Sequence, residues 1–493
     1  MLSPLAWRQS ADVGRLVFHR ARAHRSLVAM AKRDEFEERY TSGVVDEDPT
    51  PSAAVALDEP AAAAMPSGSV ALRGCVLSSK GASEDAYVVI EQGAVTAVTT
   101  TKPQGVDQLI VTDGIVMPGL IDLHGHPEYN VFAPWEPPQL YKNRGKWRDS
   151  DEYDALIKQP YNKLTDQDHL TAALTRYAET RALVGGVTAI QGAAVSPQIV
   201  EESLVRNVDR RIFGQHIGRS VVDLGRLFGD DLKKFQDGVT AGTITAVYVH
   251  LAEGVDQTSR NEFEQLKQKK LLGPATVIIH GTALDQAQLT EAAAAGAKLV
   301  WSPQSNLRLY GQTTQAKLAR DLKIPLGLGA DWVPSGSLAT LSELKVARHQ
   351  LAAQGAKDDA RQLVGMVTWH AAEIAGLAGR PGQPGHLGDL QPGVPADVCV
   401  LERCHEDPWE SVLRSDPSCV EMTMIAGNVA YARSDWYQRL TQTAPPETVW
   451  AWGREMGLDV TYATRPGAAA PPRLADLRAT ILKSYLQTGP IFA

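Results

Sequence analysis

Strand-like and helix-like segments alternate through the middle of this 493-residue chain. Short apolar runs rich in β-forming residues are separated by amphipathic stretches long enough for right-handed crossover helices. The predicted strands are the run that ends at His124 and residues 186–191, 211–215, 244–250, 275–280, 297–302 and 325–329. This alternation is typical of an α/β protein with a parallel sheet, and its natural closure is a (β/α)8 TIM barrel.

Two β-rich segments flank this region. Short β-type runs begin at Val70, with a turn at residues 91–93, and the same texture returns after residue 385. We therefore expect one small β domain made from both ends of the chain. The predicted division is an N-terminal extension and acidic Ala/Pro-rich linker (1–67), the first β part (68–117), the barrel (118–384), the second β part (385–433) and a C-terminal extension (434–493).

Composition narrows the possible partners and compartment. The net charge is −8 and the basic residues are scattered, which argues against a nucleic-acid partner. No run of about 18 apolar residues is present, so no membrane span is expected. The four cysteines are too few and too far apart for a disulfide framework in a chain of this length, which favours a reducing cytoplasm. Residues 1–33 are rich in arginine with one acid, Asp12, so an organellar transit peptide is the alternative to a plain extension.

Histidines and a carboxylate stand where several predicted strands end. His124 and His126 end the first, His250 and His280 end two others, and Asp331 follows the last. In a TIM barrel the C-terminal strand ends meet at one face, where the chemistry takes place. Side chains at positions i and i+2 of a strand point the same way, so His124 and His126 can reach one ion.

Three imidazoles and one carboxylate, from His124, His126, His250 and Asp331, form a ligand set that suits zinc and is acceptable for iron. A bound divalent cation lowers the pKa of water from about 15.7 towards roughly 7, and the second oxygen of Asp331 is available to accept the proton. A second metal usually needs a bridging group such as a carboxylated lysine, and residues 206–231 contain no lysine. We predict one divalent metal per chain, zinc first and iron second.

Two further residues are candidates for proton transfer. Glu253 lies three positions after His250, in the loop above that strand, where it can deliver a proton to substrate. His280 ends the next strand and can polarise the bond under attack or bind a second metal. The predicted catalytic residues are therefore Glu253, His280 and Asp331.

These motifs together resemble the amidohydrolase superfamily, in the branch with cytosine and guanine deaminases, methylthioadenosine/adenosylhomocysteine deaminases and triazine hydrolases. The matching signatures are residues 118–126, 250–253, 280–284, 302–306 and 327–331. The resemblance covers roughly residues 68–433. It implies a distorted (β/α)8 barrel with a flanking β-sandwich and a mononuclear site. It also implies the metal ligands His124, His126, His250 and Asp331, with proton-transfer roles for Glu253, His280 and Asp331.

An aromatic segment follows the first metal-binding strand. Residues 127–161 contain seven aromatic side chains, several times the 6% of the whole chain. We interpret the segment as a lid that stacks on a planar or apolar substrate, the alternative being that the rings only anchor a long loop. Trp332 departs from the small residues that nucleoside deaminases of this branch tend to have there. The candidate substrate contacts are Tyr129, Trp135, Arg144, Asn306 and Trp332.

The sequence thus predicts a metal-dependent hydrolase that cleaves a C–N bond of a small, heterocyclic or aromatic substrate, as a deaminase does. An amide, urea or lactam hydrolase on the same metal site is the first alternative. An inactive barrel that serves as a scaffold is the second. We expect a cytoplasmic homodimer with a small-molecule substrate.

Overall fold

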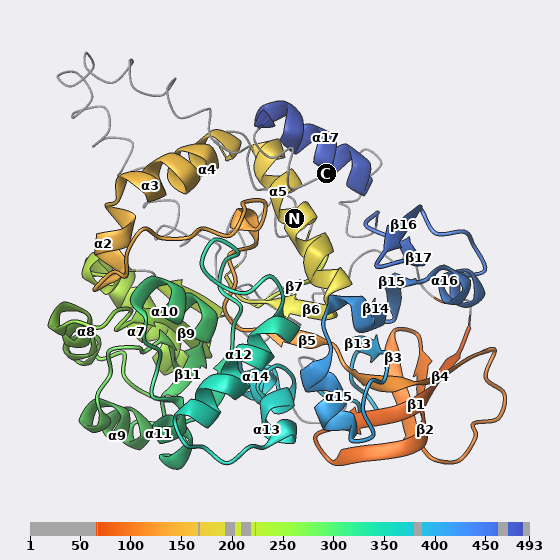
Figure 1. Ribbon diagram of the computed structural model, residues 1–493. Helices are drawn as coiled ribbons and strands as arrows, with labels where there is room; N and C mark the ends of the chain where they lie inside the picture. Colours follow the sequence, from red (N-terminus) through yellow and green to blue (C-terminus); the bar gives the residue numbers. More distant parts are fainter. Residues whose placement is uncertain are drawn as a thin grey trace, which may run out of the picture. The chain divides into compact units, whose positions relative to one another are not determined.

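The computed structural model describes residues 66, 68–165, 168–192, 203–208, 218–221, 223–378, 387–461 and 472–486 (Figure 1). All of them belong to the unit Pro49–Ala493. Nearly all of the predicted N-terminal extension and linker, and the predicted strand 211–215, lie outside the described residues.

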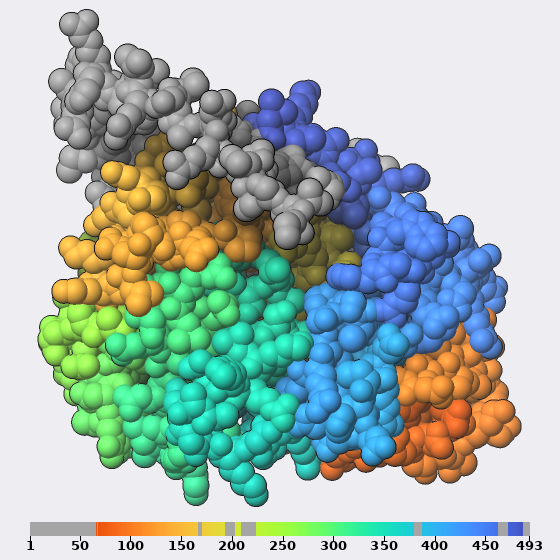
Figure 2. All heavy atoms as spheres, in the orientation of Figure 1, coloured from red at the N-terminus to blue at the C-terminus, as the bar shows by residue number. Residues whose placement is uncertain are grey.

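A nine-stranded sheet joins segments that are far apart in the sequence. Its order is β16-β17-β15-β14-β13-β4-β1-β2-β3. The strands are β1 Val70–Ser78, β2 Gly81–Glu91, β3 Ala94–Thr99, β4 Gln108–Pro118, β13 Val398–Leu401, β14 Val420–Ile425, β15 Asn428–Arg433, β16 Glu447–Ala451 and β17 Arg454–Leu458. The two ends meet where β4 pairs with β13, with Val116 opposite Val400. The orange and blue residues accordingly lie side by side in Figure 2. Strands β16 and β17 extend the sheet beyond residue 433.

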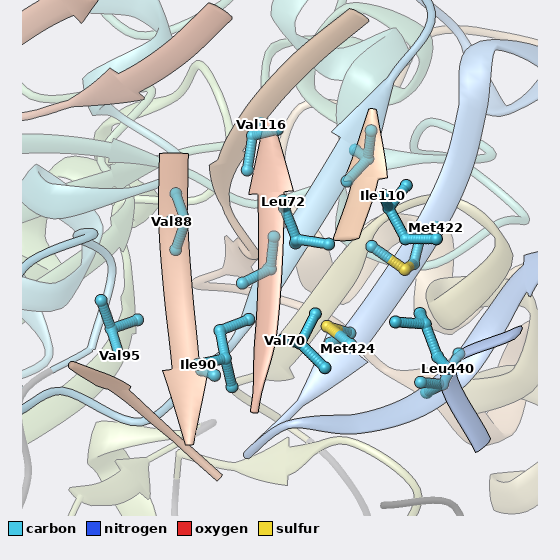
Figure 3. Close-up of a cluster of buried hydrophobic side chains, with 14 of the residues drawn as sticks. Val70, Leu72, Val88, Ile90, Val95, Ile110, Val116, Met422, Met424 and Leu440 are labelled. Carbon is cyan, nitrogen blue, oxygen red and sulfur yellow. The ribbon is translucent and has the colours of Figure 1, made fainter. Parts of the chain in front are cut away.

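One face of this sheet carries an apolar core. Val70 and Leu72 of β1, Val88 of β2 and Met422 and Met424 of β14 are almost completely buried and point toward one another (Figure 3). Residues two apart on a strand share a face, which explains the pairing of Val70 with Leu72 and of Met422 with Met424. The core therefore depends on residues from both ends of the chain.

The remaining strands are parallel and form two sheets. One has the order β12-β11-β10-β9-β8 and the other β5-β6-β7. Their bounds are β5 Leu120–Asp122, β6 Val187–Ile190, β7 Arg206–Asn207, β8 Gly218–Val221, β9 Ala246–Leu251, β10 Thr276–His280, β11 Lys298–Trp301 and β12 Leu326–Leu328. The Leu123 N–H donates to the Leu328 carbonyl (3.1 Å) and the Asp331 N–H to the His124 carbonyl (2.7 Å), which links the two sheets. The predicted α/β class is confirmed.

Helices alternate with these strands (Figure 1). Several helices are preceded by a residue whose side chain accepts a hydrogen bond from a free backbone N–H group of the first turn. Examples are Asp256 before α8 and Asp285, which forms a capping box, before α9. Helix α17 packs against α5.

None of the helices in the described ranges is long and apolar enough to cross a membrane. The helices are α2 Arg144–Arg148, α3 Asp151–Tyr153, α4 Gln159–Leu164, α5 Asp168–Val184, α7 Gly229–Ala241, α8 Gln257–Gln268, α9 Gln286–Ala294, α10 Pro303–Tyr310, α11 Ala316–Asp321, α12 Thr340–Ala353, α13 Ala360–Gly365, α14 Trp369–Ile374, α15 Pro408–Arg414, α16 Ser434–Thr441 and α17 Leu474–Ser484.

A buried ion pair joins the nine-stranded sheet to the parallel strands. Arg206 of β7 donates to Asp397 through Nε (2.7 Å) and Nη2 (2.9 Å), and the Ala426 N–H donates to the same carboxylate (2.8 Å). The two side chains are only 5% exposed. Removing one partner of such a pair leaves a buried charge without compensation.

Asp397→Asn is therefore expected to lower the free energy of unfolding by about 3–5 kcal/mol, measured by denaturant unfolding. The control is Asp358→Asn, whose carboxylate pairs with Arg348 and is 52% exposed. That change should cost about 0–1 kcal/mol. Equal losses in the two variants would contradict a stabilising role for the Arg206–Asp397 pair.

Candidate functional site

The structure brings the predicted strand-end residues together. His124 follows β5, His250 lies in β9, His280 ends β10 and Asp331 follows β12. A bridge between Gly125 and Asp331 places the ends of β5 and β12 side by side. His124, His250, His280 and Asp331 are all at most 7% exposed. The described strands therefore deliver these side chains to one buried place.

His124 is at the centre of the cluster. Its Nε2 lies 3.4 Å from Asp331 Oδ1, and His126 Nε2 lies 3.7 Å from the same oxygen. The ring centroid of His124 is 4.7 Å from that of His250 and 5.0 Å from that of His280. Two groups of residues could each hold a metal ion. One is His124, His250 and His280, and the other is His124, His126 and Asp331. Within each group, the possible ligand atoms lie within 4.8 Å of one another.

The backbone is strained where the strands end. Ala252, His280 and Asp331 have φ values of 53°, 68° and 61°, a region that costs a residue other than glycine about 1–3 kcal/mol. Hydrogen bonds stabilise the backbone at two of these positions. Thr314 Oγ1 donates to the His280 carbonyl (2.6 Å), and the Asp331 N–H donates to the His124 carbonyl. Such strain is concentrated at functional sites.

A glycine allows β12 to approach His124 closely. A Cβ at Gly329 would lie 2.4 Å from the His124 Cβ and 2.5 Å from its backbone nitrogen. Any larger residue at this position would therefore push the end of β12 away from His124.

Burial keeps most of the imidazoles neutral. It lowers the pKa of His126 to about 3, with a further contribution from His124, and it lowers the pKa of His250 well below 6.5. Burial also lowers the pKa of His280. For His124, burial opposes protonation, but the carboxylates of Asp331, Asp122 and Glu253 together raise the pKa, with Asp331 contributing most. Neutral imidazole is the form that binds metals.

The donor atoms fit a divalent cation. Both ring nitrogens of His124 and Nδ1 of His250 are buried and have no hydrogen-bond partner among the described residues. Buried polar atoms are normally satisfied, so such nitrogens indicate a ligand. His280 differs, because Asn306 Nδ2 donates to its Nδ1 (3.2 Å). Neutral His280 then carries its hydrogen on Nε2 and offers no free nitrogen to a metal.

Asp122 supports the site and was not predicted from the sequence. Its Oδ1 accepts from the backbone N–H groups of His124 and Ala330, both at 3.1 Å, and its Oδ2 accepts from Thr340 Oγ1 at 3.2 Å. Burial raises the pKa of Asp122 to about 6. The carboxylate thus holds the ends of β5 and β12 together. Its position two residues before His124 is the signal that would have identified it.

Glu253 has a partner at each oxygen. Tyr310 donates its hydroxyl hydrogen to Oε1 (2.7 Å), whereas Oε2 lies 3.7 Å from His280 Nε2 and 3.4 Å from Arg144 Nη1. Glu253 is 5% exposed. Tyr310 was not predicted from the sequence. It lies four residues after Asn306 in α10, on the same helix face, and this spacing would have pointed to it.

The predicted aromatic segment is packed ring against ring. Tyr129 stacks on Tyr161 with centroids 4.1 Å apart and lies 5.1 Å from Trp332. Trp147 lies 5.5 Å from Trp332 and 6.5 Å from Trp135. These contacts are what the anchoring alternative expects. Tyr129 also lies 6.3 Å from the His126 ring, at the edge of the histidine cluster.

Of the other candidate substrate contacts, Arg144 lies against Glu253 and Asn306 against His280. Asn306 Oδ1 accepts from Thr313 Oγ1 (3.2 Å), which in turn accepts from Trp301 Nε1 (2.6 Å). Both residues therefore contact the predicted proton-transfer groups. A role for either one in substrate binding remains a prediction.

Comparison with known proteins finds a match to a family model and several similar sequences. Residues 239–430 match the model of the amidohydrolase family. The chain is 24% identical over 363 residues to a 5-methylthioadenosine/S-adenosylhomocysteine deaminase of Haloarcula marismortui, a match that covers 65% of this chain and 81% of that protein. The chain is 27% identical over 167 residues to a deaminase of the same name from Teredinibacter turnerae, 32% of this chain and 36% of that one.

Among solved structures, the fold is similar to that of a zinc-bound adenosine deaminase from Xanthomonas campestris. Its TM-score is 0.64 at 15% identity, and the match covers 85% of this chain and 98% of that one. A guanine deaminase from C. acetobutylicum gives a TM-score of 0.58 at 14% identity, with coverages of 73% and 99%. The family-model match confirms the resemblance to the amidohydrolase family that the motifs of this chain indicated, and the solved structures show a similar fold.

Proposed function

We propose that this chain is a metal-dependent aminohydrolase that removes an amino group from a heterocyclic substrate. The observation that carries the proposal is the buried cluster around His124, with its unpartnered imidazole nitrogens beside the Asp331 carboxylate. The deaminase names of the curated relatives support this choice over amide, urea or lactam hydrolysis, which the same residues would also serve.

We assign the metal ligands to His124, His126, His250 and Asp331, with one zinc as the first choice and iron as the second. The hydrogen bond from Asn306 argues against His280 as a ligand. When bound, the metal would supply a water whose pKa lies near 7 rather than about 15.7.

The residues of the chain then have separate tasks in proton transfer. Asp331 accepts the proton of the water through a carboxylate oxygen. Glu253 carries a proton to the substrate nitrogen through Oε2, the oxygen that faces His280. His280 keeps a hydrogen on Nε2 and donates it to a polar atom of the substrate. Water adds to the carbon, the C–N bond breaks, and the amine or ammonia leaves.

For the fold, we propose that the parallel strands complete a distorted (β/α)8 barrel. The order β8-β9-β10-β11-β12-β5-β6-β7 supports closure, because neighbours follow chain order once β12 is joined to β5. Only β7 and β8 would have to meet. The nine-stranded sheet would belong to the flanking β-sandwich, with the domain boundaries proposed from the sequence.

The test is ammonia release from purified protein with a panel of 5-methylthioadenosine, guanine, cytosine and aminotriazines, beside simple amides, ureas and lactams. We expect turnover of at least one heterocyclic amine. Turnover restricted to amides, ureas or lactams would replace deamination by the alternative reaction. No turnover of any compound by metal-loaded protein would favour the inactive scaffold.

A further inference from the structure

Helix α2, which lies in the aromatic segment, reaches both carboxylate oxygens of Glu253. Trp147 donates its indole N–H to the Tyr310 hydroxyl oxygen (2.8 Å), and Tyr310 donates to Glu253 Oε1 (2.7 Å). Arg144, one turn earlier on α2, lies 3.4 Å from Oε2. Tyr310 and Trp147 are buried, and they connect the predicted lid with the predicted proton carrier.

The direction of this hydrogen-bond chain is fixed by chemistry. An indole N–H can only donate, so the Tyr310 oxygen must accept from Trp147. The single hydroxyl hydrogen of Tyr310 is then free to point at Glu253. Burial raises the pKa of Tyr310 well above 10, with the Glu253 charge as the next cause, so the phenol stays protonated and remains a donor. Oε1 is thereby occupied, and Oε2 is left to face His280.

The backbone on either side of Glu253 is also paired with this segment. The Arg144 N–H donates to the Glu253 carbonyl (3.2 Å), and the Val255 N–H donates to the Lys142 carbonyl (2.8 Å). A Cβ at Gly254 would lie 2.5 Å from the Lys142 carbonyl oxygen, so this close approach needs glycine. The placement of Glu253 therefore depends on the seating of residues 142–147.

We propose that Tyr310 is a positioning residue for Glu253 and that Trp147 sets its orientation, so that seating of α2 makes the proton carrier competent. The inference rests on the proposed role of Glu253. Oε2 carries the proton, and Tyr310 fixes Oε1 in place and stabilises the carboxylate once that proton has been given to the substrate. The segment that would recognise the substrate thus also controls the proton-transfer residue.

Tyr310→Phe tests the proposal in the metal-loaded protein, with the heterocyclic amine that releases ammonia fastest. We expect kcat to fall about 10-fold, which is less than the roughly 10²–10⁴-fold expected for complete loss of an acid–base group. The pH profile of kcat/KM should also change, because the Glu253 carboxylate loses a hydrogen-bond donor. The ionisable groups that face Glu253, among them Arg144, His280, Glu262 and His124, are unchanged in this variant.

The matched control is Tyr437→Phe, which removes a buried hydroxyl in α16 that donates to another carboxylate, Asp459 Oδ2 (3.3 Å). It should leave kcat and the pH profile unchanged. Unchanged kcat and pH profile in Tyr310→Phe, with metal content and melting temperature also unchanged, would overturn the proposal.

A double-mutant cycle tests the part assigned to Trp147. Trp147→Phe keeps an aromatic ring and removes the N–H. If Trp147 acts through Tyr310, the double variant Trp147→Phe/Tyr310→Phe should be no slower than the slower single variant. Multiplicative losses would overturn the proposed link between α2 and Glu253.

A substrate-independent measurement separates this inference from the proposed function. Infrared spectra of protein labelled with 13C-carboxyl glutamate, with Glu253→Gln as the reference, report the Glu253 carboxylate directly. Its band should shift in Tyr310→Phe and not in Tyr437→Phe. If the band shifts but Glu253→Gln remains fully active, the positioning is right and the proposed function is wrong. A band unchanged in Tyr310→Phe overturns the positioning itself.

Discussion

Glu253→Gln is expected to lower kcat about 10²–10⁴-fold, the usual contribution of a positioned acid–base group. The amide has nearly the shape of the carboxylate, and its oxygen can still accept from Tyr310, so the fold and the histidine cluster should be preserved. The amide cannot carry a proton between water and substrate. Metal content should equal that of the unaltered protein, as measured by elemental analysis beside steady-state kinetics.

The control for this variant is Glu264→Gln. Glu264 is on α8, 53% exposed, and pairs with Lys267 at the surface. Its replacement should leave kcat within about twofold, because exposed ion pairs contribute little to a distant buried site. A Glu253→Gln protein with full activity would remove Glu253 from the proposed mechanism.

The second large effect is expected from His250→Asn. His250 lies in β9, 7% exposed, and its Nδ1 has no hydrogen-bond partner in the described part of the chain. Loss of a direct ligand should weaken metal binding by more than the roughly 10–100-fold that outer-shell partners contribute. Purified His250→Asn should therefore contain little metal and show almost no ammonia release.

His349→Asn is the matched histidine control, because His349 is exposed on α12. It should keep the metal content and kcat of the unaltered protein. A His250→Asn protein with full metal content would show that His250 is not a ligand. The candidate ligands would then be His124, His126 and Asp331.

Much of the α/β region could be predicted from the sequence. The strands ending near His124, His250 and His280 are continuous apolar runs bounded by polar residues, and both signals are local. Strands β7 Arg206–Asn207 and β8 Gly218–Val221 were not predicted. They are two and four residues long, too short for a periodic pattern.

The site residues divide in the same way. His124, His126, His250 and Asp331 are distinctive residue types at strand ends, so parallel strand geometry predicts that they gather. Tyr310 owes its place to a hydrogen bond with Glu253, which is 57 residues away in the sequence. A contact between residues so far apart in the sequence leaves no periodic pattern. The only local signal is that Tyr310 shares a face of α10 with Asn306, four residues earlier.

The aromatic segment shows where composition alone is ambiguous. An excess of rings predicts stacking but does not say whether the partner is a substrate or another ring. The stack of Tyr129 on Tyr161 and the contacts of Trp332 show that the rings pack on one another. The backbone pairing of Lys142 with Val255 connects the segment to the Glu253 loop. Only the folded chain reveals that link.

Metal dependence is the central claim, and it is tested most directly by removing and restoring the metal. Ammonia release should disappear after treatment with a chelator and removal of the chelator by dialysis. It should return on addition of about one equivalent of zinc or ferrous ion per chain, with elemental analysis of the same samples giving about one bound ion. Protein that contains no metal and still releases ammonia at the full rate would contradict the account.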